Sequence, residues 1–112
     1  MLIYKIFRQN EWAELKSKGE TTGAPIDVLD GYVHFSTADQ VSSTLRKHFA
    51  GETELVLLAV EVEPLGADLK WETARGDQLF PHLYRNLKLS DVLWNRDLDP
   101  RSALDQLLGL TS

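Results

Sequence analysis

Apolar residues recur along this chain with two different periods, and the two periods separate predicted strands from predicted helices. Residues 2–7 and 31–35 are rich in β-branched and aromatic side chains, which is typical of strands. Residues 54–62 begin apolar on both faces and end in alternation, which indicates a central strand that Pro64 stops. Shorter extended segments are expected around Leu69 and Trp71, around 80–84 and around 91–94.

Helical periodicity appears in the first half of the chain. Asn10 is a suitable N-cap for a helix that continues to about Lys18, where Gly19 ends it. Trp12 and Leu15 lie three residues apart and share one face of that helix. Residues 20–30, which include Gly23, Pro25, Asp27 and Asp30, are interpreted as a loop.

A second helix is expected to begin at Ser36 or Thr37, either of which can act as N-cap, and to end near Ala50 and Gly51. Its apolar residues recur every four positions, at Val41, Leu45 and Phe49. A terminal helix is expected over 102–110, with Asp99 or Ser102 as its cap and Pro100 near its start. Strands outnumber helices, and the helices lie toward the two ends, so the predicted fold is α+β with a mainly antiparallel sheet.

Length and composition limit the classes of protein to consider. The 112 residues suit one domain spanning 1–112, and the 43% apolar share is enough for a core. The absence of cysteine excludes disulfides, thiolate zinc sites and cysteine nucleophiles. A net charge of −5 gives no strong nucleic-acid signal. The longest apolar run, 55–60, cannot span a bilayer, and no signal-peptide core is present, so we expect a cytoplasmic protein with no membrane contact. Trp94 and the C-terminal leucines could be buried within the chain or pair two chains, and we favour a monomer.

His34 is the first candidate for chemistry. Strand alternation places Tyr32, His34 and Ser36 on one face, opposite Val33 and Phe35. The following strand-to-helix junction offers free N–H groups, which suit an anion. The alternative is a half-buried histidine bonded to a neighbouring strand, with Ser36 only a helix cap, and the local pattern favours neither interpretation.

The segment Phe80-Pro81-His82-Leu83-Tyr84 is the second candidate. In an extended chain Phe80, His82 and Tyr84 share a face, so an imidazole and a phenol point the same way and could position a planar ligand. The alternative is a rigid edge segment whose aromatic residues pack on the core, which we favour for Phe80.

Glu72 directly follows Trp71, and an aromatic wall could desolvate the carboxylate, raise its pKa and suit it to acid/base chemistry. The alternative, which local pattern alone favours, is a strand glutamate facing water.

His34, His82 and Glu72 could also form a facial metal triad, although no local His-x-x-x-His pairing supports it. The chain has no Gly-x-Ser-x-Gly elbow, P-loop or Rossmann glycine fingerprint.

The segments Gly31-Tyr32-Val33-His34-Phe35-Ser36-Thr37 with Gln40, and Phe80-Pro81-His82-Leu83-Tyr84, occur together with Tyr4-Lys5-Ile6, Trp12 and Trp71-Glu72. In this combination the chain resembles a bacterial family of uncharacterised proteins, domain-of-unknown-function family 952, from its first strand to about Val92. Members of that family look like compact relatives of the ADP-ribosyltransferase fold, a split antiparallel β-structure flanked by helices that in other families grips NAD in a cleft.

The resemblance implies roles for particular residues. His34 with Ser36 would hold the adenosine ribose, and Thr37 fits the same pattern. Tyr84 or His82 would line the nicotinamide pocket, and Glu72 would assist departure of nicotinamide. Arg85, where many members would have glycine, would narrow the cleft or bind a ligand phosphate.

The first hypothesis is therefore an enzyme, or a degenerate enzyme, that binds NAD or a related ADP-ribosyl or nucleotide ligand and carries out ADP-ribosyl or glycosyl transfer. Glu72 and His82 are its candidate catalytic residues, and His34, Ser36, Thr37 and Tyr84 its candidate cofactor-binding residues. The second hypothesis is a non-catalytic module that binds a small metabolite or a partner, and a metal-dependent hydrolase is a distant third. The first predicts that His34 and His82 open onto one cavity, with Glu72 nearby.

Overall fold

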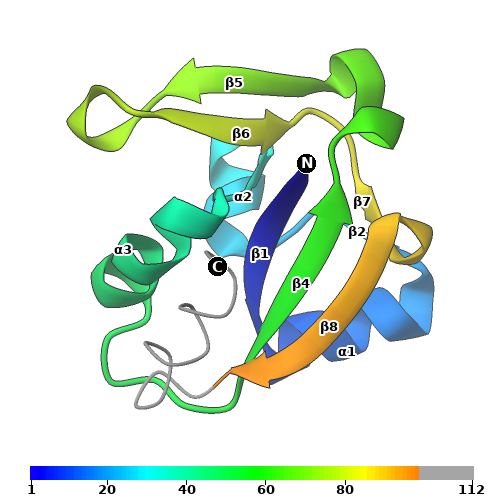
Figure 1. Ribbon diagram of the computed structural model, residues 1–112. Coiled ribbons are helices and arrows are strands. Elements are labelled where there is room, and N and C mark those ends of the chain that lie inside the picture. Colours follow the sequence, from blue (N-terminus) through cyan, green and yellow to red (C-terminus); the bar gives the residue numbers. More distant parts are fainter. Residues whose placement is uncertain (99–112) are drawn as a thin grey trace.

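The computed structural model describes residues 1–98, and its largest sheet holds three antiparallel strands (Figure 1). The strand order is β1-β4-β8, from β1 (Leu2–Arg8), β4 (Leu55–Glu61) and β8 (Val92–Leu98). Residues 55–60 of the central strand are buried, as expected for a strand covered on both faces. The strands expected at residues 2–7 and 54–62 are thus confirmed, and the one expected at 91–94 extends further, to Leu98.

A second antiparallel sheet lies across one end of the first (Figure 1). Its order is β3-β6-β5, from β3 (Val33–His34), β6 (Leu79–Leu83) and β5 (Leu69–Thr73). A two-stranded pair joins β2 (Glu20–Thr21) to β7 (Leu87–Lys88). Short 3₁₀ turns occupy Glu63–Asp68, Arg75–Asp77 and Leu89–Asp91. The described residues therefore form an α+β arrangement of antiparallel sheets, as predicted.

Helix α1 (Gln9–Lys18) begins two residues earlier than the sequence suggested. Its N-cap is Arg8, and Asn10 lies inside the first turn, so the prediction of an Asn10 cap is wrong. The reason is that Glu11 Oε1 accepts a hydrogen bond from the Arg8 main-chain N–H at 2.8 Å, which closes the helix start. Gly19 ends the helix in the left-handed conformation, as expected.

Helix α2 (Pro25–Asp30) replaces the loop that the sequence suggested for this segment. Pro25 suits the first helical position, and Asp27 Oδ2 accepts a hydrogen bond from the Ala24 N–H at 2.7 Å. These two devices stabilise a helix too short to show periodicity in the sequence.

Helix α3 (Ala38–His48) has Thr37 as its N-cap, one of the two residues proposed for that role. It ends at His48, with Phe49 as C-cap, which is earlier than the predicted end near Ala50 and Gly51. All three described α-helices lie in the first half of the chain, and the terminal helix expected over 102–110 falls outside the described residues.

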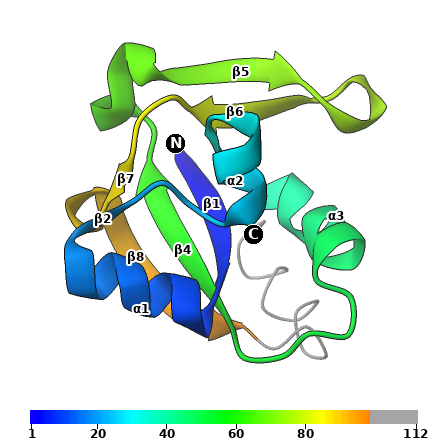
Figure 2. The same cartoon turned by 180° about the vertical axis from the view of Figure 1, so that it is seen from behind.

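Two apolar clusters pack on opposite faces of the first sheet, because alternate residues of β1 and β4 point to opposite sides. Helix α1 covers one face (Figure 2) and contributes Trp12 and Leu15 to the cluster there. Helix α3 supplies Val41 and Leu45 to the other cluster, which also contains Tyr4 and Ile6. The predicted apolar faces of both helices are therefore the buried ones.

Candidate functional site

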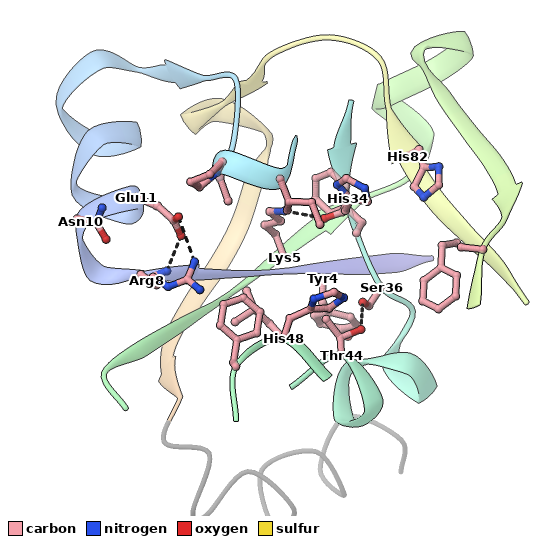
Figure 3. Close-up of a pocket in the computed structure, with 18 residues that line it drawn as sticks. Tyr4, Lys5, Arg8, Asn10, Glu11, His34, Ser36, Thr44, His48 and His82 are labelled. Carbon is pink, nitrogen blue, oxygen red and sulfur yellow. Dashed lines mark hydrogen bonds and ion pairs between the residues drawn. The ribbon is translucent and has the colours of Figure 1, made fainter. Parts of the chain in front are cut away.

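His34 and His82 lie opposite each other in the β3–β6 pairing, and their ring centroids are 5.3 Å apart, edge to face. Both residues line one cavity of about 490 Å³ (Figure 3). Glu72 lies next to this pair, because its carboxylate is hydrogen-bonded to His82. The geometric expectation from the sequence, two imidazoles at one cavity with Glu72 nearby, is met.

The cavity lies beside β1, between that strand and the segments that carry His34, Ser36 and His82 (Figure 3). Much of its wall is aromatic or aliphatic, which suits a planar organic ligand. The lining residues are Tyr4, Lys5, Ile6, Arg8, Asn10, Glu11, Ala24, Pro25, Ile26, His34, Phe35, Ser36, Thr44, His48, Phe49, Ala74, Phe80 and His82.

Glu72 links His82 to Tyr84 from behind the cavity wall. Its Oε1 accepts hydrogen bonds from the Tyr84 hydroxyl at 2.6 Å and from His82 Nδ1 at 2.9 Å. The hydrogen bond from Tyr84 and, to a smaller extent, that from His82 lower the pKa of Glu72. The hydrogen bond to Glu72 is the largest cause that raises the pKa of Tyr84 to about 12. The suggestion that Trp71 desolvates Glu72 and raises its pKa is therefore wrong, because Glu72 remains partly exposed and strongly hydrogen-bonded.

His82 is held on its face as well as at its edge. The ring of Tyr32 stacks on it with centroids 4.2 Å apart and planes 22° from parallel. Its side chain is almost entirely buried. With Nδ1 bonded to Glu72, Nε2 has no hydrogen-bonding partner among residues 1–98. A ring fixed in this way can offer Nε2 to a ligand or a proton.

His34 has both ring nitrogens at carboxylates. Nδ1 is 2.6 Å from Asp27 Oδ1, and Nε2 is 2.9 Å from Asp30 Oδ2. A neutral imidazole carries one N–H, so only the doubly protonated ring can donate to both acids. His34 therefore contacts the cavity as a ring clamped by helix α2, and a ligand would bond Nε2 only by displacing the half-exposed Asp30.

Asp27 and Lys5 form a buried ion pair beneath His34 that the sequence interpretation missed. Lys5 Nζ is 2.8 Å from Asp27 Oδ2, with both side chains sealed from solvent. Burial would raise the pKa of Asp27, but hydrogen bonds from His34 and the charge of Lys5 outweigh it and lower that pKa. Burial lowers the pKa of Lys5, and Asp27 only partly opposes this effect. The available signal was alternation, which places Lys5 on the same buried face as Ile3 and Phe7.

Ser36 and Thr37, the other two predicted cofactor-binding residues, have different positions. Ser36 lines the cavity, and its hydroxyl lies 2.9 Å from that of Thr44. Its main chain forms an isolated antiparallel bridge with Tyr4 of β1. Thr37 caps α3 and is not among the lining residues, so the structure gives it a structural role.

Arg85 also differs from the role suggested for it. Its guanidinium makes a two-point contact with Asp91, at 2.9 and 3.1 Å, which satisfies the cation. It does not line the cavity. Arg85 therefore stabilises the segment after β6, and the expectation that it narrows the cleft is wrong.

The facial metal triad proposed from the sequence is not supported. Within residues 1–98, no group of three acidic or histidine side chains is arranged to hold a metal ion. His34 instead bonds Asp27 and Asp30, and His82 bonds Glu72.

Across the described residues 1–98, no helix is long and apolar enough to cross a bilayer.

Fold and site together define an α+β protein with a histidine-lined cavity between two antiparallel sheets. The chain belongs to the family described as "Protein of unknown function (DUF952)", whose model matches residues 6–95. The family resemblance drawn from the two sequence segments is thus confirmed.

Solved structures of a relative agree with this assignment. The crystal structure of protein CC0527 from Caulobacter crescentus is 50% identical, with a TM-score of 0.86, and the match covers 88% of this chain and 87% of that one. The solution NMR structure of the same protein is 51% identical, with a TM-score of 0.79, and covers 88% of this chain and 84% of that one. No curated protein matches the chain.

Proposed function

We propose that this protein binds NAD or a related ADP-ribosyl or nucleotide ligand in the cavity beside β1. The observation that carries the proposal is the meeting of His34 and His82, from different strands, at one cavity of about 490 Å³ with aromatic walls. A cavity of this size suits a base with its ribose. The split between the two antiparallel sheets supports our related proposal that the fold is ADP-ribosyltransferase-like.

The ligand would be oriented by groups on both sides of the cavity. The ring of His82 and the aromatic side chains of Phe35 and Phe80 offer flat surfaces for a base. The hydroxyl of Ser36 lies at the wall and can hydrogen-bond a ribose hydroxyl. Tyr84 does not line the cavity and acts through Glu72, so we assign it a positioning role.

We further propose that the Glu72–His82 pair makes the site capable of ADP-ribosyl or glycosyl transfer. The bond from the ribose C1′ to the nicotinamide nitrogen breaks, and its electron pair leaves with nicotinamide. An acceptor hydroxyl forms the new C1′–O bond and passes its proton to His82 Nε2. Glu72, bonded to Nδ1, stabilises the resulting imidazolium.

Ligand binding is tested by thermal unfolding and calorimetry with NAD, ADP-ribose, nicotinamide and zinc. A ligand at 100 times its Kd adds about 2.7 kcal/mol to the free energy of unfolding. We expect NAD or ADP-ribose to stabilise the wild type and His34→Ala to weaken the effect. Glu14→Gln, at an exposed helix position that does not line the cavity, serves as control. Absence of any nucleotide-induced stabilisation would contradict the proposal, and a shift with zinc alone would favour the hydrolase.

Transfer is tested separately from binding. Glu72→Gln should bind NAD with nearly unchanged affinity but release nicotinamide about 10²–10⁴-fold more slowly, the usual contribution of general acid–base catalysis. Chromatographic measurement of free nicotinamide reports the rate. If the wild type binds NAD and releases none, the protein is a non-catalytic binding module. That second candidate is favoured by one observation, that both His34 ring nitrogens already have carboxylate partners.

A further inference from the structure

Among the described residues, the edge of β1 that faces away from β4 is hydrogen-bonded at Tyr4 but not two residues later, at Ile6. Tyr4 exchanges two main-chain hydrogen bonds with Ser36. The Tyr4 N–H donates to the Ser36 carbonyl at 2.8 Å, and the Ser36 N–H donates to the Tyr4 carbonyl at 2.9 Å. These bonds use the edge of β1 that faces away from β4. In an antiparallel strand alternate residues point their main-chain groups to the same edge, so Ile6 presents its N–H and C=O there too.

The residue that should pair with Ile6 is bonded elsewhere. Continuing the Tyr4–Ser36 pairing by two residues would place His34 opposite Ile6. The His34 N–H instead donates to Asp27 Oδ1 at 3.0 Å, and the His34 carbonyl accepts from Lys5 Nζ at 2.9 Å. The side chains of Lys5 and Asp27 thus bond the His34 main-chain groups that would otherwise pair with Ile6, and they keep the two sheets apart at this point.

Nothing comparable occupies the Ile6 side. Ile6 lines the cavity and is only 5% exposed. No residue within 1–98 accepts from its N–H or donates to its C=O. Buried main-chain groups are almost always paired, because a group left without a partner costs about as much free energy as a lost hydrogen bond. A donor and an acceptor, side by side, therefore face a cavity with aromatic walls.

We propose that the N–H and C=O of Ile6 bind the edge of a planar ring that carries one hydrogen-bond acceptor beside one donor. A primary carboxamide on a pyridine ring, as in nicotinamide, and the amino-purine edge of adenine both have this pattern. The aromatic residues Tyr4, Phe35 and Phe80 line the same cavity and suit the ring faces. This inference rests on the proposed function and names the part of the ligand that is recognised.

The test compares ligands that differ only at that edge. In ¹⁵N-edited NMR titrations, nicotinamide or adenosine should move the Ile6 amide proton downfield. N,N-dimethylnicotinamide and N6,N6-dimethyladenosine lack the donor hydrogens, so each should bind at least tenfold more weakly than its parent. Whichever parent ring produces the Ile6 shift identifies the source of the edge.

A backbone variant tests the same contact from the protein side. Ile6→Pro removes an N–H that does not belong to the β1–β4 ladder, and proline is tolerated on edge strands when its nitrogen faces outward. Ile6→Ala is the matched control, because it removes similar side-chain volume but keeps the N–H. We expect Ile6→Pro to bind the parent ring at least tenfold more weakly than Ile6→Ala. If Ile6→Pro does not fold, the Ile6 amide shift in the wild type decides.

The outcomes separate this inference from the proposed function. Binding of ADP-ribose or NAD with no shift at Ile6, and equal affinity for parent and dimethylated rings, overturns the inference and leaves the proposed function standing. Binding of nicotinamide or adenosine through Ile6, without any binding of NAD or ADP-ribose, supports the inference and overturns the nucleotide proposal. If none of these compounds binds, both are overturned.

Discussion

Tyr84 and Glu72 are joined by a 2.6 Å hydrogen bond in which the phenol donates to the carboxylate oxygen that also accepts from His82. The bond holds the Tyr84 proton, which is why the pKa of this phenol is raised to about 12. Two partners on one oxygen fix the Glu72 carboxylate and, through it, the His82 ring. The pKa of Tyr84 therefore reports whether its hydrogen bond to Glu72 is intact.

Replacing Glu72 by glutamine should lower the pKa of Tyr84 from about 12 toward the ordinary tyrosine value near 10. The physical reason is that a neutral amide no longer penalises the phenolate. Ultraviolet absorbance of the tyrosinate measures the titration, and subtraction of the Tyr84→Phe curve isolates one residue. An unchanged high value in Glu72→Gln would show that Glu72 does not hold this proton.

Asp27→Asn should be among the most destabilising single substitutions at the site. It leaves the Lys5 ammonium buried without its counter-charge, a change that typically costs about 3–5 kcal/mol. Asp30→Asn is the matched control, because Asp30 is partly exposed and its carboxylate pairs with the His34 ring, so its loss should cost about 1 kcal/mol or less. Urea unfolding measures both. Equal costs for the two variants would contradict the importance given to the Lys5–Asp27 pair.

The stability conferred by Asp27 should depend on pH in a defined direction. Its pKa in the folded protein is below 3.8, so the folded state binds fewer protons than the unfolded state as pH falls through this range. The contribution is therefore complete above about pH 5 and is lost on acidification below 3.8. Unfolding midpoints measured from pH 6 to 2 should show the gap between wild type and Asp27→Asn narrowing toward the acid end. A gap that stays constant would mean that Asp27 has the same pKa in both states.

Gly23→Ala should destabilise the protein more than Gly31→Ala. Both glycines have positive φ, 105° and 85°, so each alanine carries a backbone cost of about 1 kcal/mol. At Gly31 a Cβ would meet no atom within 4 Å, whereas at Gly23 it would overlap the Asp27 carboxylate. Thermal unfolding measures the difference. Similar losses at both positions would show that the Asp27 carboxylate can move aside at little cost.

Strands β1 and β4 were predictable because most of their residues are apolar, as expected for strands that are buried on both faces. Residues 2–7 are rich in β-branched and aromatic side chains and residues 54–62 in leucine and valine, and this signal does not depend on distant contacts. The shared face of Tyr32 and His34, and that of His82 and Tyr84, also followed from alternation alone. Which residues would meet across the sheets depended on strand pairing, so alternation alone could not establish that the two histidines share a cavity.

The errors arose where helix boundaries depend on short-range features that apolar periodicity does not reveal. Asn10 is a good cap by residue type, but Glu11 reaches back to the Arg8 N–H and moves the helix start. Residues 25–30 are too few to show helical periodicity, so α2 was missed. Asp27 was consequently seen as a loop charge, although it accepts hydrogen bonds from Ala24, His34 and Lys5.

The buried ion pair also limits how this protein could be made more robust. Replacing a buried ion pair with well-packed apolar side chains is often neutral or stabilising by about 1–4 kcal/mol. Here apolar side chains at positions 5 and 27 would leave the His34 N–H and C=O without their present partners. These groups could then form hydrogen bonds with the main chain of Ile6, and the cavity would close. The Lys5–Asp27 pair therefore holds the cavity open in place of an apolar packing that would fill it.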